Sequence, residues 1–267
     1  MENLMIKLFK NLFSNKFNQE INLQTIPFKE VFYQHDVNAC DKWINYLDIY
    51  EEFFKPYISN FPSVLEIGVQ NGGSLQILKK YFKDAKIYGV DIDSRVSQLD
   101  LGDDIKVYNF DITKKDSIEK NLQKLKFDII IDDGSHICSE IISTFYLLFS
   151  RLKPGGIYLT EDLCTSYWQS HGGSFPSESS SIEFFKKLTD LLNFYHIESN
   201  KVLEFFSEQD LDIARWLHAI TFHDSVTIVK KLKKQRSSPY NRTVVGNYDP
   251  VTSTIYEAKK RGWYYNT

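Results

Sequence analysis

Short apolar runs alternate with amphipathic segments along the central part of the chain. Apolar, β-branched runs bounded by Gly, Pro, Asp or Asn predict buried strands, whereas apolar residues that recur every three to four positions predict helices. The predicted strands are 63–68, 85–90, 105–110, 127–131 and 157–160, and the predicted helices are 74–82, 117–125, 139–152 (stopped by Lys153-Pro154-Gly155-Gly156) and 182–193. Strands that alternate with helices at this spacing predict a parallel, doubly wound α/β sheet.

Two more apolar runs, 219–222 and 226–229, are joined near His223-Asp224 and predict an antiparallel hairpin at the edge of that sheet. The fold expected is therefore a mostly parallel, doubly wound sheet of seven strands with an antiparallel edge hairpin. We divide the chain into an N-terminal helical arm or lid (1–60), a ligand-binding domain (61–235) with an active-site loop (167–181), and a C-terminal tail (236–267).

Composition narrows the class of protein. The 267 residues are 42% hydrophobic and 25% charged, and with a net charge of -3 nothing suggests a general nucleic-acid binder. No apolar run is long enough to span a bilayer, and the cysteines (Cys40, Cys138 and Cys164) lack metal or disulfide spacing, which fits a reducing cytoplasm. Residues 1–17 have an amphipathic helical pattern and predict packing on the chain's own domain or on a second subunit, so we expect a homo-oligomer.

The most informative stretch is Ile-Ile-Ile-Asp-Asp-Gly-Ser-His at 129–136. It predicts a buried strand with Asp132, Asp133 and His136 at its carboxyl end, where open α/β sheets bind their ligands. Carboxylates can hold a hard cation there, and an imidazole three residues further on can take a proton. On its own, the stretch fits a solvated acidic turn equally well.

A second acid pair, Glu161-Asp162, follows the next predicted strand of the sheet. Neighbouring parallel strands bring their carboxyl ends together, so Asp133, Glu161 and Asp162 are expected to converge on one cation. Oxygen ligands of this kind favour Mg²⁺, Mn²⁺ or Ca²⁺ over zinc. With such an ion, His136 is placed to deprotonate a hydroxyl group.

The turn between the first strand and the first helix reads Glu-Ile-Gly-Val-Gln-Asn-Gly-Gly-Ser at 66–74, which lacks the G-x-G-x-x-G spacing of dinucleotide sites. Glu66 would repel a pyrophosphate but suits an ammonium group, and Asp91 and Asp111 end the next two strands, where a ribose and an adenine would lie. A zwitterionic amino acid joined to adenosine, S-adenosylmethionine, fits better than NAD. The candidate cofactor-binding residues are Glu66, Gly68, Asn71, Gly72, Ser74, Asp91, Asp111 and Asp132.

Together these stretches resemble a bacterial family of metal-dependent class I methyltransferases that act on sugar hydroxyls, among them macrolide-sugar and rhamnosyl 2-O-methyltransferases and capsule sugar methyltransferases. The segments that carry the resemblance are 64–75, 87–93, 131–136, 161–168 and Gly172-Gly173. The resemblance implies a Rossmann-like fold, S-adenosylmethionine and Mg²⁺ (or Mn²⁺) as cofactors, and Asp133, Glu161 and Asp162 as metal ligands. It also implies that His136 is the general base, with Asp133 beside it in the catalytic centre.

The resemblance further implies an acceptor that is a sugar or sugar nucleotide, in a surface polysaccharide, a capsule or a glycoside. We expect Tyr167, Trp168 and His171, in the loop 167–181, to close over this sugar. The family's N-terminal Thr-Asp-Lys segment has a counterpart in Cys40-Asp41-Lys42, followed by Tyr46 and Tyr50, but with a cysteine and a shorter spacing, so no cofactor contact is assigned to it. Three alternatives stay open: a catechol-type O-methyltransferase, an NAD- or nucleotide-binding oxidoreductase, and a binding protein without catalysis.

Overall fold

The computed structural model describes residues 26–197, 202–240 and 245, and in them seven strands form one sheet in the order β3-β2-β1-β4-β5-β7-β6. The strands are β1 (Ser63–Ile67), β2 (Lys86–Asp91), β3 (Ile105–Asn109), β4 (Phe127–Asp132), β5 (Leu152–Thr160), β6 (Leu217–His223) and β7 (Val226–Lys231). The first five strands pair in parallel, whereas β7 pairs antiparallel with both β5 and β6. The predicted sheet, with its antiparallel edge hairpin, is confirmed.

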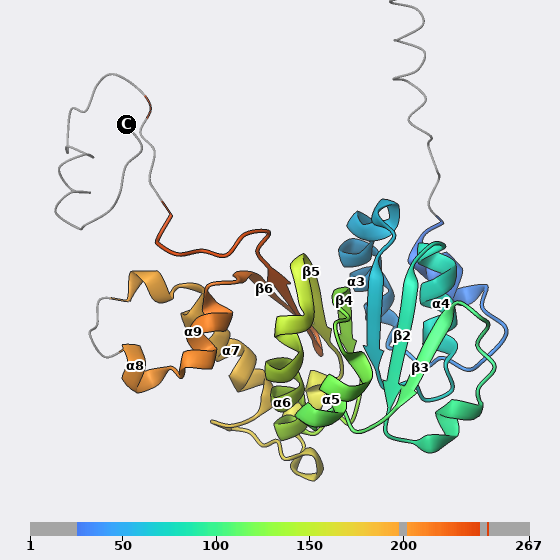
Figure 1. The fold of residues 1–267 in the computed structure, drawn as a ribbon. Helices are drawn as coiled ribbons and strands as arrows, with labels where there is room; N and C mark the ends of the chain where they lie inside the picture. Colours follow the sequence, from blue (N-terminus) through green and yellow to red (C-terminus); the bar gives the residue numbers. More distant parts are fainter. Residues whose placement is uncertain (1–25, 198–201, 241–244, 246–267) are drawn as a thin grey trace, which may run out of the picture.

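Helices cover both faces of the sheet (Figure 1). One face packs against α2 (Phe28–Tyr33), α3 (Ile44–Phe54) and α4 (Gly73–Phe82), and the other against α5 (Lys115–Leu122), α6 (Cys138–Leu148), α7 (Ser181–Leu192) and α9 (Glu208–Ala214); α8 (Val202–Phe205) precedes α9. Burial on both faces explains why Ile129, Ile130 and Ile131 are all apolar and all fully buried. Among the helices described, none is long and apolar enough to cross a membrane.

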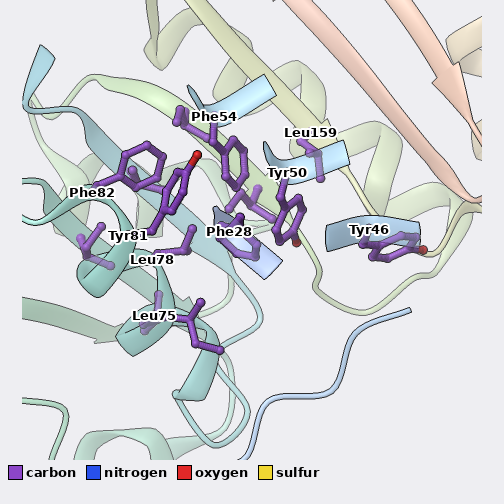
Figure 2. Packing of buried hydrophobic residues seen from close by; sticks show 14 of the residues in the cluster. Phe28, Tyr46, Tyr50, Phe54, Leu75, Leu78, Tyr81, Phe82 and Leu159 are labelled. Carbon is purple, nitrogen blue, oxygen red and sulfur yellow. The ribbon is translucent and has the colours of Figure 1, made fainter. Parts of the chain in front are cut away.

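The helix α3 joins the N-terminal segment to the core. Tyr46, Tyr50 and Phe54 recur every four residues and are buried on one face of this helix. Phe28 of α2 packs edge-on against Tyr50 with ring centroids 4.9 Å apart, and Tyr50 stacks on Phe54 at 4.7 Å (Figure 2). Residues 28–54, which we assigned to an arm or lid, therefore form part of the core, while the helix expected over 1–17 and nearly all of the tail lie outside the described residues.

The helix predicted over 139–152 is wrong at its end. α6 stops at Leu148, a 3-10 turn covers Phe149–Arg151, and β5 already begins at Leu152. The Lys153-Pro154-Gly155-Gly156 segment, expected as the turn that stops the helix, is the first half of β5. Gly155 has φ +84° and its N–H donates to Leu232 O at 3.1 Å, so a contact from the far end of the chain holds this irregular half-strand. Local residue preferences cannot reveal such a partner.

Candidate active site

The acidic residues predicted at the ends of two strands lie together because β4 and β5 are neighbours in the sheet. In the order β1-β4-β5, Ile67 pairs with Asp132 and Asp132 pairs with Thr160. Asp133 N donates to Ile67 O at 3.0 Å and Glu161 N donates to Asp132 O at 2.9 Å. The ladder therefore continues one residue past each strand and sets Asp133 beside Glu161 at the carboxyl edge of the sheet.

A buried lysine lies among these carboxylates. The Lys42 ammonium is 2.5 Å from Asp133 Oδ2, 2.9 Å from Glu161 Oε2 and 3.8 Å from Glu66 Oε1. Burial alone would lower the pKa of Lys42, but the negative charge of Glu161 and its neighbours outweighs this effect and raises it well above the usual value. Tyr50 Oη also donates to Glu161 Oε1, so both oxygens of the Glu161 carboxylate are engaged. Lys42 therefore forms ion pairs both with Glu66, a candidate cofactor-binding residue, and with Asp133 and Glu161, candidate metal ligands.

Asp162 faces His136 across the site. Its Oδ1 accepts hydrogen bonds from Trp43 Nε1 at 2.9 Å and from Tyr46 Oη at 2.8 Å. Its Oδ2 lies 3.6 Å from His136 Nε2, which is also 3.8 Å from Asp133 Oδ1. Asp133, His136 and Asp162 each offer one possible metal-ligand atom, and these three atoms lie within 4.8 Å of one another, which is compact enough to hold a cation. Among the described residues, His136 Nδ1 is buried and has no partner.

The glycine turn after β1 packs directly on this acidic edge. Gly68 has φ +90°, and a Cβ there would lie 2.0 Å from Asp133 O, so only glycine allows the two loops to approach. The turn is held by Asp91, whose Oδ2 accepts from Val69 N at 2.8 Å and from Gln70 N at 3.1 Å. Asp91 thus shapes the turn as well as ending β2.

A cavity opens beside the turn, and four of the predicted cofactor residues line it: Gly68, Asp91, Asp111 and Asp132. Burial raises the pKa of Asp132 to about 7, even though Tyr158 Oη donates to Asp132 Oδ2 at 2.9 Å. The apolar part of the lining is Ile67, Val90, Ile92, Phe110, Ile112 and Ile141. Such a mixture of apolar walls and few polar groups suits a small organic ligand.

The other four predicted cofactor residues, Glu66, Asn71, Gly72 and Ser74, are not part of this lining. Ser74 Oγ donates to Glu66 Oε1 at 2.6 Å, while Glu66 Oε2 is buried and has no partner among the described residues. Burial raises the pKa of Glu66 to about 7, and Lys42 limits the rise. The free oxygen of Glu66 is therefore an acceptor still to be satisfied.

The predicted substrate residues follow Asp162 in a tightly folded loop. Tyr167 and Trp168 are 51% and 49% exposed, and the ring of His171 lies 5.5 Å from that of Trp168. Thr165 Oγ1 donates to His136 O at 2.9 Å, which ties this loop to the histidine. The aromatic side chains thus stand in solvent on a loop anchored at the site.

Four residues near the start of α3 reach the site without having been assigned to it: Lys42, Trp43, Tyr46 and Tyr50. A signal was present, because Lys42, Tyr46 and Tyr50 recur every four residues in the segment to which the resemblance gave no contacts. A four-residue spacing indicates that these side chains share one face of a helix, but it does not identify the residues that this face contacts. Only the fold shows that this face meets the acids.

Comparison with known proteins identifies relatives. The sequence profile of the FtsJ-like methyltransferases matches residues 39–166. The chain is 36% identical over 171 residues to the 8-demethyl-8-alpha-L-rhamnosyl tetracenomycin-C 2'-O-methyltransferase of Streptomyces olivaceus, covering 58% of this chain and 44% of that protein. It is 35% identical over 164 residues to the mycinamicin VI 2''-O-methyltransferase of Micromonospora griseorubida, covering 57% and 40%. The chain thus spans less than half the length of these relatives.

Solved structures of a similar methyltransferase have the same fold as this chain. The MycE methyltransferase of the mycinamycin biosynthetic pathway, in complex with Mg and SAH, superposes with a TM-score of 0.68 at 27% identity, over 78% of this chain and 55% of that chain. A complex of MycE with Mg, SAH and mycinamycin VI gives 0.69 at 24% identity, over 90% and 60%, and shows the same fold. The class I methyltransferase fold and the resemblance to sugar O-methyltransferases, both expected from the sequence, are confirmed.

Proposed function

We propose that this chain is an S-adenosylmethionine-dependent O-methyltransferase that methylates a sugar hydroxyl with the help of a divalent metal ion. The observation that carries the proposal is the compact set of Asp133, His136 and Asp162 beside a cavity that ends at the glycine turn. A metal-binding pair of acids, a base and a methyl-donor pocket at one sheet edge are the parts that such a reaction needs.

The residues present fit S-adenosylmethionine. The unpartnered Oε2 of Glu66 suits an ammonium group, and the carboxylates of Asp91 and Asp111, at the ends of β2 and β3, suit ribose hydroxyls and an adenine amine. Gly68 lines the cavity without a side chain, so a ligand can lie directly against the backbone there. The similar MycE methyltransferase was solved in complex with Mg and SAH, which supports a methyl-donor site in this chain.

The residues also fit a hard divalent ion. We assign Asp133 and Asp162 as ligands because their carboxylates face one another across His136. Glu161, the third ligand implied by the resemblance, is bonded to Lys42 and Tyr50 and would have to give up such a bond to hold the ion. Mg²⁺ and Mn²⁺ both accept such ligands.

The chain's own groups account for the remaining chemistry. When bound, S-adenosylmethionine supplies the methyl group, and a divalent ion supplies positive charge at the acceptor oxygen. His136 accepts the proton of the acceptor hydroxyl through Nε2, and Thr165 fixes the backbone of that histidine. Asp133 and Asp162 hold the imidazolium that results. Trp168 and Tyr167 shield the sugar from water, and Glu66 orients the methyl donor.

The test is methyl transfer to a panel of rhamnosides, nucleotide sugars, capsule fragments and catechols, with and without EDTA. We expect transfer to a sugar, its loss in chelator, and its recovery with Mg²⁺. His136→Ala should lower the rate at least about 100-fold while Mg²⁺ binding, followed by calorimetry, persists. His196→Ala, at an exposed position of the 3-10 turn Phe194–His196, is the matched control.

The outcomes separate the possible roles. Full activity in EDTA refutes the metal, and full activity of His136→Ala refutes the base. Loss of Mg²⁺ binding in His136→Ala would make the histidine a ligand instead. Transfer to catechols alone would favour the catechol-type O-methyltransferase, and binding of NADH in place of S-adenosylhomocysteine would favour the oxidoreductase. If a sugar is methylated, its identity decides between a capsule and a glycoside acceptor.

A further inference from the structure

Trp43 is an exposed tryptophan that is nevertheless fixed at the site. It is 59% exposed, yet its indole N–H donates to Asp162 Oδ1 at 2.9 Å. Its backbone is fixed as well, because Trp43 is the N-cap of α3 and its carbonyl accepts from Tyr46 N at 3.0 Å. The ring therefore extends from a candidate metal carboxylate into solvent in a defined orientation.

Holding Asp162 does not by itself explain that ring. Tyr46 Oη donates to the same Oδ1 at 2.8 Å from a side chain that is only 1% exposed. A buried donor thus already orients the carboxylate, and exposing a large apolar ring to water is unfavourable. An exposed aromatic ring that is held by a hydrogen bond to a candidate ligand carboxylate offers a preorganised contact surface for a ligand at this site.

The position of the ring suggests which ligand. Asp162 Oδ2 lies 3.6 Å from His136 Nε2, so the indole and the imidazole contact the two oxygens of one carboxylate group. An acceptor hydroxyl that reaches His136 brings the ring carbons of its sugar toward the indole. The C–H face of a pyranose is apolar and weakly positive, which complements the negative face of an aromatic ring.

We propose that Trp43 is an acceptor-contact residue that selects pyranosides with an apolar C–H face by stacking its exposed indole on them. This inference rests on the proposed function, because the acceptor is placed by the carboxylates and His136. It adds to the loop residues Tyr167 and Trp168 a contact that the N-terminal segment supplies through Asp162.

Three variants separate the ring from its N–H group. Trp43→Phe keeps an aromatic face and loses the donor, Trp43→Ala loses both, and Tyr46→Phe loses a donor to the same oxygen without changing the exposed surface. Phe205→Ala removes another exposed aromatic ring, 68% exposed on α8, and serves as the control.

The measurement is saturation-transfer NMR of methyl α-L-rhamnopyranoside, methyl α-D-glucopyranoside and methyl α-D-galactopyranoside with full-length protein, Mg²⁺ and S-adenosylhomocysteine. We expect saturation of the ring C–H protons of at least one sugar. Trp43→Ala should reduce it at least tenfold, whereas Trp43→Phe, Tyr46→Phe and Phe205→Ala should keep at least half. Calorimetry with Mg²⁺ and S-adenosylhomocysteine runs in parallel on every variant.

Equal saturation by wild type and Trp43→Ala overturns the inference, and so does the failure of all three sugars to respond to wild type. Equal loss in Trp43→Phe and Trp43→Ala overturns it too, because the N–H group acting through Asp162 would then explain the effect. Wild-type protein that binds neither S-adenosylhomocysteine nor Mg²⁺ refutes the proposed function itself, which keeps the two failures distinct.

Discussion

Replacing Lys42 by methionine tests the electrostatics of the site. Methionine keeps nearly the length and apolar stem of the side chain but removes the charge. Lys42 is 3% exposed at its side chain and lies within 4 Å of Asp133, Glu161 and Glu66, at 2.5, 2.9 and 3.8 Å. The variant leaves these acids facing one another with no cation between them.

Removing one partner of a buried ion pair costs about 3–5 kcal/mol, because the remaining charge stays buried and unpaired. We expect Lys42→Met to lower the free energy of unfolding by that amount in metal-free buffer. For a domain of this size, the midpoint of thermal unfolding should fall by roughly 6–20 °C. Mg²⁺ should stabilise the variant more than the wild type, because the ion supplies the missing positive charge.

The assay is urea unfolding followed by circular dichroism, with EDTA and with MgCl₂. Lys29→Met is the matched control, because Lys29 forms an exposed ion pair with Asp48 at 3.8 Å, and such pairs contribute about 0–1 kcal/mol. A Lys42→Met loss below about 1 kcal/mol in EDTA would refute the reasoning, since it would mean that the three carboxyl groups need no compensating charge.

Three other predictions follow from single contacts. Gly68→Ala should lower the free energy of unfolding, measured by urea unfolding, by at least about 2 kcal/mol, because the new Cβ would lie 2.0 Å from Asp133 O at a residue with φ +90°. The same variant should lose S-adenosylhomocysteine binding in calorimetry. Unchanged stability would contradict the close approach of the two loops. Tyr158→Phe should cost about 1–3 kcal/mol, because it removes the 2.9 Å hydrogen bond to buried Asp132, and a loss under 0.5 kcal/mol would show that the bond is dispensable. Burial lowers the pKa of Lys231 from 10.5 to about 8, so the folded protein releases this proton before the unfolded chain does, and this group's contribution to stability should rise from about pH 8 to about pH 10.5. Urea unfolding across that range should show less of a rise in Lys231→Met, and identical profiles would contradict the shift.

Much of the fold was readable because its signals are local. Ile129, Ile130 and Ile131 are apolar on both faces of their strand, as a covered parallel sheet requires, and the 219–222 and 226–229 runs are close enough to form a hairpin. The end of α6 was misjudged because Gly155 belongs to a strand held by Leu232, a residue far along the chain.

The candidate site likewise contains residues whose proximity the sequence predicts and residues whose proximity it does not. Asp133 and the Glu161-Asp162 pair were placed together by one rule, that adjacent parallel strands end at the same edge. Lys42 was not placed, because its partners Asp133 and Glu161 lie 91 and 119 residues away. No spacing rule connects residues so far apart.

The sequence by itself determined the class of sheet and the edge at which the candidate site residues lie, because hydrophobic periodicity and strand-end acids are signals that span only a few residues. Only the tertiary structure decided that α3 packs across the sheet and brings Lys42, Trp43, Tyr46 and Tyr50 to those acids. The physical reason is that a buried ion pair or a shared hydrogen-bond acceptor depends on distances in space, and these exist only once the hydrophobic cores on both faces of the sheet have formed.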